Sequence, residues 1–143
     1  MIRGALSHVD LTVTELSRSQ VFYDHVLREL GYKPLPEAGA GSPCWGIADT
    51  AGGFFTIALQ TASREGSKQK HDRYAPGLHH MAFHADSRED VDDFYKFLLT
   101  IGVQVLDPPA EYTYTEGYYA LFFADPDGLK FEVVFEPTLR GNV

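Results

Sequence analysis

The sequence predicts an α+β protein in which one structural unit occurs twice. Residues 8–27 align without gaps with residues 80–99, and residues 48–56 align with residues 124–132 in the same order. Each copy has a segment of period-two alternation, then one with helical spacing, then further alternating segments. A repeat of this length is typical of supersecondary units that complete one core together.

The first half should contain one strand, one helix and one hairpin. Residues 6–13 alternate between apolar and polar types, as a half-buried strand does. A helix is expected to begin near Ser17, with Gln20 as its capping-box partner, and to end at Gly31. The predicted hairpin has strands at residues 44–48 and 53–60, around a turn at Asp49–Gly52.

The second half repeats this order with stronger signals. Residues 78–85 are predicted as a strand, and a helix should run from Ser87, capped with Asp90, to Gly102. A hairpin follows, because Asp125-Pro126-Asp127-Gly128 combines a proline that presets φ with a glycine that tolerates positive φ. Its strands are expected at residues 117–124 and 129–136.

Two polar segments are predicted to connect these elements. Residues 61–77 read as a linker between modules at about 5–60 and 78–136, which together make residues 1–143 a single domain. Residues 107–117 read as a second loop, which could serve as a lid.

Composition narrows the class of function. No apolar run approaches the ~20 residues of a membrane span, and the N-terminus lacks the apolar core of a signal peptide, so a cytoplasmic protein is expected. The single cysteine, Cys44, excludes an intrachain disulfide and a thiolate zinc cluster. A net charge of −8 disfavours nucleic acid and anionic membranes as partners and favours a small molecule.

Strand alternation places three residues of metal-binding types on the same side of the predicted sheet. His8, His80 and Glu132 each lie early in a predicted strand and on its more polar face. Two imidazoles and one carboxylate would leave open positions on a divalent metal for water and substrate. A histidine in a strand can equally be a hydrogen-bonded residue or a general base. His84 shares the face of His80, whereas His79 is predicted to face the helices.

Three motifs together resemble the glyoxalase / bleomycin-resistance / extradiol-dioxygenase superfamily, also called the vicinal oxygen chelate proteins. They are SHVDLTVTELSRSQVFYDHVLRELGY, GLHHMAFHADSREDVDDFYKFL and YYALFFADPDGLKFEVV, and they lie in both halves. The chain is similar in particular to uncharacterised bacterial proteins labelled lactoylglutathione-lyase-like. The resemblance implies two tandem βαβββ modules curling around a central cavity that carries a metal.

The same resemblance implies the site. It makes His8, His80 and Glu132 the ligands of one divalent ion, with Fe, Mn, Zn, Ni and Co left undistinguished, and gives Glu132 a catalytic role. The first-module counterpart of Glu132 is Thr56 in the alignment, which has neither the charge nor the basicity of a carboxylate. The expected substrate pocket comprises Asp10, Thr56, His84, Tyr118 and Glu136, with Tyr119 as the alternative to Tyr118.

Two functions remain open from the sequence. The first is a metal-dependent enzyme acting on a small vicinal-oxygen substrate, either a glyoxalase-like lyase or an extradiol-type dioxygenase. Because Thr56 replaces a carboxylate, the reaction of glyoxalase I on methylglyoxal is disfavoured. The second is a metal-free protein of the bleomycin-resistance type that binds a drug or another small molecule on its aromatic residues. The modules could pair within one chain or across a homodimer.

Overall fold

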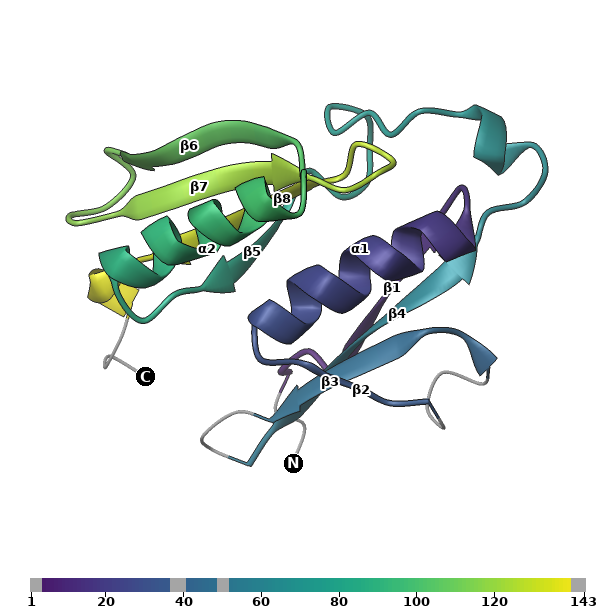
Figure 1. The fold of residues 1–143 in the computed structure, drawn as a ribbon, viewed down its shortest axis with the longest axis horizontal. Helices are drawn as coiled ribbons and strands as arrows, with labels where there is room; N and C mark the ends of the chain where they lie inside the picture. Colours follow the sequence, from purple (N-terminus) through teal and green to yellow (C-terminus); the bar gives the residue numbers. More distant parts are fainter. Residues whose placement is uncertain (1–3, 37–40, 49–51, 140–143) are drawn as a thin grey trace. The chain divides into compact units, whose positions relative to one another are not determined.

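The computed structural model describes residues 4–36, 41–48 and 52–139. The chain divides into two compact units, Met1–Gln69 and Lys70–Val143, and each contains a four-stranded sheet and a long α-helix (Figure 1). The predicted α+β class and the repeated βαβββ order are therefore confirmed. No helix in the described ranges is long and apolar enough to cross a membrane.

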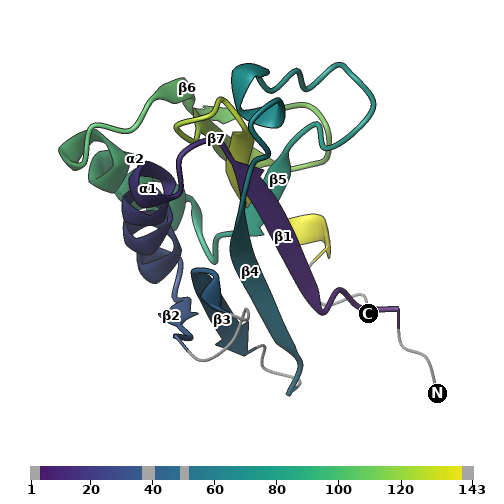
Figure 2. The same cartoon turned by 90° about the vertical axis from the view of Figure 1, so that its right-hand side faces the viewer.

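The first unit begins with a strand that pairs with the last strand of the same unit. The sheet order is β1-β4-β3-β2, with β1 parallel to β4 and the other pairs antiparallel (Figure 2). Its elements are β1 (His8–Val13), α1 (Leu16–Glu29), β2 (Lys33–Pro34), β3 (Cys44–Ala48) and β4 (Phe54–Thr61). The predicted turn at Asp49–Gly52 falls largely outside the described residues.

The second unit has the same connectivity, with sheet order β5-β8-β7-β6 and a parallel β5–β8 pair. Its elements are β5 (Met81–His84), α2 (Arg88–Thr100), β6 (Val105–Glu111), β7 (Tyr119–Ala124) and β8 (Lys130–Phe135). Short 3-10 turns follow β4 (η2, Gly66–Lys68) and β8 (η3, Pro137–Leu139).

Strand β6 corrects the expectation of a loop over residues 107–117. Val105–Glu111 pairs antiparallel with β7, although its register shifts on both sides of Asp107. Pro108 and Pro109 obscure the strand pattern in the sequence, but proline is tolerated at the edge of a sheet, where one side of the strand needs no ladder hydrogen bonds. Only the segment after Glu111 remains irregular before β7.

The two helices begin differently. In α2, the Ser87 side chain accepts a hydrogen bond from the Asp90 backbone N–H at 3.1 Å, so the predicted cap is confirmed. In α1 the helix begins at Leu16, close to the predicted start, but the predicted capping pair of Ser17 and Gln20 is wrong, because the N-cap residue is Glu15 and makes no side-chain capping bond. The Ser17 hydroxyl donates instead to the Glu15 carboxylate.

One face of each sheet packs against the helix of its own unit. Tyr23 of α1 lies 6.4 Å from Trp45 of β3, and Phe94 of α2 lies 5.8 Å from Phe123 of β7, between ring centroids. Because side chains alternate along a strand, Glu132 lies on the opposite face of β8 from the buried Phe131. This opposite face, free of the helix, is called the open face below.

Candidate functional site

A buried carboxylate is the centre of the open face of the second unit. Glu132 is only 2% exposed, and its Oε2 lies 3.2 Å from Nε2 of His80. Its other oxygen, Oε1, accepts a very short hydrogen bond from the hydroxyl of Tyr118. Both oxygens therefore have partners, as a buried charge requires.

The strands set this geometry. Glu132 lies opposite Ala82 of β5 on one side and opposite Phe122 of β7 on the other. The hairpin between β7 and β8 is held by the Asp125 carboxylate, which accepts hydrogen bonds from the backbone N–H groups of Asp127 and Leu129 at 2.9 and 2.8 Å. The predicted turn at residues 125–128 thus sets the β7–β8 register, and the parallel β5–β8 pairing brings Glu132 beside His80.

Aromatic rings surround the carboxylate. Phe122 is buried with Ala120 and Val134, and Tyr112 and Tyr118 pack against this cluster. The ring of Tyr112 lies 5.5 Å from that of Phe122 and stacks on Tyr114 at 5.6 Å, with an interplanar angle of 3°. These rings form an aromatic wall beside Glu132 on the open face.

The structure separates the two adjacent tyrosines that the sequence left as alternatives. Tyr118 bonds to Glu132, whereas the Tyr119 hydroxyl donates to Asp92 of helix α2 at 2.8 Å. Burial and the hydrogen bond to Glu132 raise the pKa of Tyr118 far above its ordinary value. Its hydroxyl therefore keeps its proton at neutral pH and acts as a donor to the carboxylate.

His79 corrects another expectation. It is exposed and lies before β5, and its Nδ1 is 2.7 Å from Nδ1 of His80. Desolvation and the nearby charges of His80, Arg73 and Lys130 lower the pKa of His79. With a proton on Nε2, His80 donates to Oε2 of Glu132. With the proton of the neutral ring on Nδ1 instead, His80 donates to His79, and the Nε2 lone pair becomes available to a metal ion.

The remaining pocket residues are not gathered around Glu132. His84 is exposed and lies opposite Val134, one same-face position beyond Glu132. Glu136 follows β8 and accepts a hydrogen bond from Thr115 at 2.9 Å. Of the expected pocket residues, the structure places Tyr118 in direct contact with Glu132.

The open face of the first unit holds the other predicted residues. His8 is exposed, with Nδ1 3.3 Å from the Ser7 hydroxyl, and it lies opposite Thr56 in the β1–β4 register. Asp10 accepts a hydrogen bond from Gln60 Nε2 at 2.7 Å. Here the polar groups bond locally to each other, and the carboxylate is exposed rather than buried.

The registers revise the equivalence between the two units. Thr56 matches Glu132 in the hairpins, since Thr56 lies opposite Gly46 and Glu132 lies opposite Phe122 at the same distance from the turn. When the pairing with the first strand of each unit is compared instead, the counterpart of Glu132 is Ala58. Ala58 lies opposite Asp10 of β1, and Glu132 lies opposite Ala82 of β5, the residue that aligns with Asp10. Neither residue is a carboxylate, so the first unit lacks one on either alignment.

The second unit offers a divalent metal two donors. Among the described residues, no group of three or more His, Cys, Asp or Glu side chains is placed to hold an ion. Two ligands bound at 2.0–2.2 Å and at right angles are about 3 Å apart, and the 3.2 Å between His80 Nε2 and Glu132 Oε2 fits this spacing. The hydrogen bond from Tyr118 to the second oxygen fits a carboxylate that binds through one oxygen.

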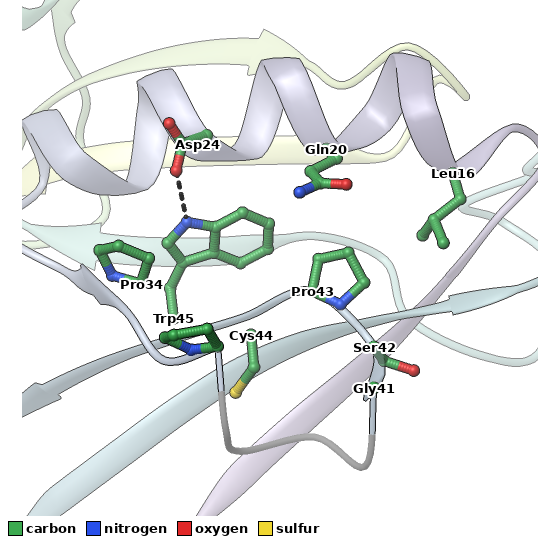
Figure 3. Close-up of a pocket in the computed structure, with 10 residues that line it drawn as sticks. Leu16, Gln20, Asp24, Pro34, Gly41, Ser42, Pro43, Cys44 and Trp45 are labelled. Atoms are coloured by element: carbon green, nitrogen blue, oxygen red, sulfur yellow. Dashed lines mark hydrogen bonds between the residues drawn. The ribbon is translucent and has the colours of Figure 1, made fainter.

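A separate hollow lies in the first unit, between α1 and the chain around the start of β3 (Figure 3). It has a volume of about 390 Å³, and Trp45 forms part of its wall. The Asp24 carboxylate accepts from the Trp45 indole at 3.0 Å and from Arg28 at 2.9 Å. Asp24, the carboxylate among the described lining residues, is thus already paired, and none of these described residues is a predicted site residue.

Comparison with known proteins assigns the family. The Glyoxalase/Bleomycin resistance protein/Dioxygenase superfamily matches residues 5–133. The chain belongs to this superfamily. It is 32% identical, over 90% of its length and 97% of the relative's, to the uncharacterized protein YqjT of Bacillus subtilis.

Solved structures of the same superfamily share the fold. A glyoxalase-like protein from Bacillus halodurans has a TM-score of 0.75 at 28% identity, covering 92% of this chain and 96% of that one. A glyoxalase/bleomycin resistance protein from Albidiferax ferrireducens has a TM-score of 0.63 at 25% identity, covering 92% and 98%. Superfamily members typically bind a divalent metal and small molecules.

Proposed function

We propose that the chain is a metal-dependent enzyme that acts on a small molecule with two vicinal oxygens, in a lyase or dioxygenase reaction. The observation that carries this proposal is the buried carboxylate of Glu132 beside Nε2 of His80. Taking a carboxylate out of water costs several kcal/mol, and a site that binds a metal gives a functional reason to retain it.

His80 and Glu132 would hold the ion, and His8 of the first unit would supply the third ligand, as the superfamily resemblance implies. The metal would act as a Lewis acid on the substrate oxygens. Tyr118 holds its proton toward Oε1 and thereby orients Glu132. His79 can fix the tautomer of His80 through their 2.7 Å contact. The aromatic wall excludes water from one side of the carboxylate.

A second candidate is a metal-free protein that binds a planar small molecule. The stacked pair Tyr112 and Tyr114 favours it, because Tyr114 is 68% exposed and presents an aromatic surface to solvent. In this case His80 and Glu132 form an ion pair that stabilises the fold. A homodimer and a cytoplasmic location remain predictions under both candidates.

Metal analysis separates the two candidates. Protein purified without chelator or nickel resin should contain about one divalent ion per chain. His80→Ala and Glu132→Ala should each lower the occupancy at least tenfold, and His8→Ala should lower it if the third ligand is correct. His25→Ala and His71→Ala are matched controls, because both residues are exposed. Equal occupancy in all variants, or no metal in the unmodified protein, would contradict the metal-dependent proposal.

A further inference from the structure

Lys130 shares the open face with Glu132. The two residues are separated by one position in β8, so their side chains point to the same side of the sheet. The Lys130 ammonium lies 3.8 Å from the centroid of the Phe122 ring. Phe122 is the cross-strand partner of Glu132, and its ring is 6.4 Å from that of His80. The ammonium is therefore held over the ring that adjoins the proposed metal ligands.

Further cationic or protonatable groups lie in a row beside it. The His79 ring is 4.9 Å from His80 and 5.6 Å from Tyr74, and the guanidinium carbon of Arg73 lies 5.1 Å from the Tyr74 ring centroid. The whole chain has 20 acidic and 12 basic residues. Arg73 and Lys130 thus place two positive charges near His79, in a protein whose net charge is negative.

Lys130 makes no ion pair with any carboxylate in the described ranges. The carboxylate on the same face, Glu132, already accepts from Tyr118 and lies against His80. A cation–π contact uses the charge of an ammonium but satisfies few of its three N–H donors. The half-buried Lys130 can therefore donate to an anion that enters this face.

We propose that Lys130 determines substrate specificity by binding an anionic group, such as a carboxylate, on the molecule whose vicinal oxygens approach His80 and Glu132. This inference rests on the proposed function. The ammonium lies over the Phe122 ring, whose centroid is 6.4 Å from that of His80, so the anion should lie about one small ring away from the vicinal oxygens. The Phe122 ring would contact the apolar part between them.

The test compares two probes that differ only in the anion. Catechol and 3,4-dihydroxybenzoate both carry vicinal oxygens, and the second adds a carboxylate across the ring from them. Binding of each to the purified, metal-containing protein is measured by isothermal titration calorimetry. We expect 3,4-dihydroxybenzoate to bind at least tenfold more tightly than catechol, and this preference should weaken as salt is added because it is electrostatic.

Three lysine variants carry the test. Lys130→Met retains an apolar stem over Phe122 and should abolish the preference while changing catechol affinity less than twofold. Lys130→Arg should retain the preference. Lys96→Met is the matched control, because Lys96 is exposed on α2 and paired with Asp93.

The outcomes distinguish this inference from the proposed function. His80→Ala and Glu132→Gln should weaken the binding of both probes alike. If they do so and Lys130→Met keeps the preference, the role of Lys130 is wrong and the metal site stands. If the unmodified protein binds both probes equally, the role of Lys130 is also wrong. If it binds neither probe, both proposals are contradicted.

Discussion

The open sheet faces of the two units differ in how their carboxylates are buried and paired. In the second unit, the carboxylate of Glu132 is buried and bonded to Tyr118, with His80 at 3.2 Å. In the first unit, the carboxylate of Asp10 is exposed and bonded to a neutral amide, Gln60. The backbone order of strands and helix is the same in both. A duplicated scaffold can therefore retain its strand order while only one copy keeps a buried, paired carboxylate, since the side chains on a fold can change without changing the fold.

The pairing of the first strand with the last strand differs in register between the two units. Paired residues of β1 and β4 are 48 positions apart in the sequence, as in Asp10 and Ala58, whereas those of β5 and β8 are 50 apart, as in Ala82 and Glu132. The two registers therefore differ by two residues. A shift of two residues keeps every side chain on its original face. The cores can therefore remain alike although the polar residue beside the first strand changes.

The largest effect is expected from adding a carboxylate to the first unit. The unmodified protein should convert the methylglyoxal–glutathione adduct at well below about 1 per second, because the first unit supplies no carboxylate to act as a base or as a further ligand. Thr56→Glu, directly opposite His8, should raise this rate about 100-fold. Turnover is measured by steady-state spectrophotometry.

Ala58→Glu serves as the comparison, because Ala58 is the counterpart of Glu132 by the first-strand register. It is only 4% exposed and lies opposite Cys44, so a glutamate there should overpack the sheet and lower stability without raising the rate. Rapid turnover by the unmodified protein, at 1–10³ per second, would show that the missing carboxylate does not limit this reaction.

The next largest effect is expected on metal affinity, when the two neighbouring tyrosines are substituted in turn. Tyr118→Phe removes the hydrogen bond to Oε1 of Glu132 and should weaken metal binding 10- to 100-fold, the usual loss when the partner of a ligand is removed. Tyr119→Phe removes the bond to Asp92 on the helix side and should change metal affinity less than threefold. Competition with a chromogenic chelator measures both, and equal losses would contradict a positioning role for Tyr118.

The hydrogen bond between Tyr118 and Glu132 should also make the free energy of unfolding depend on pH in the alkaline range. The pKa of Tyr118 is raised in the folded state, so the folded protein binds more protons than the unfolded chain above the ordinary tyrosine pKa of about 10. Its contribution is complete below pH 10 and is lost as the pH rises further, by up to about 1 kcal/mol per pH unit. Urea unfolding between pH 9 and 11.5 should show a shallower decline for Tyr118→Phe, and an unchanged slope would contradict the assignment.

The smallest effect is expected on stability, when a serine at the start of each helix is substituted. Ser87→Ala should lower the free energy of unfolding by about 1 kcal/mol, because Ser87 caps α2. Ser17→Ala should change it by no more than about 0.3 kcal/mol, because Ser17 lies inside α1 and bonds only to Glu15. Thermal or urea unfolding measures both, and equal losses would indicate that Ser17 contributes to the start of α1 after all.

Local sequence signals were sufficient where one residue type controls the backbone. The capping pair Ser87 and Asp90 and the turn at residues 125–128 both appear where they were predicted. Gly31 and Gly102 follow their helices with φ of 88° and 69°, a region that glycine adopts without strain. The edge strand β6 was missed because its pairing with β7, rather than its own pattern, makes it a strand.

The sequence by itself determined the repeated order of strand, helix and hairpin, and it indicated that His80 and Glu132 lie on the same side of a sheet, because alternation and turn chemistry are local properties. Only the tertiary structure decided that Tyr118 rather than Tyr119 bonds to Glu132, that Lys130 covers Phe122, and that the two units differ in register. These depend on which residues of neighbouring strands lie opposite each other. That pairing is set by contacts far apart in the chain, which no local pattern specifies.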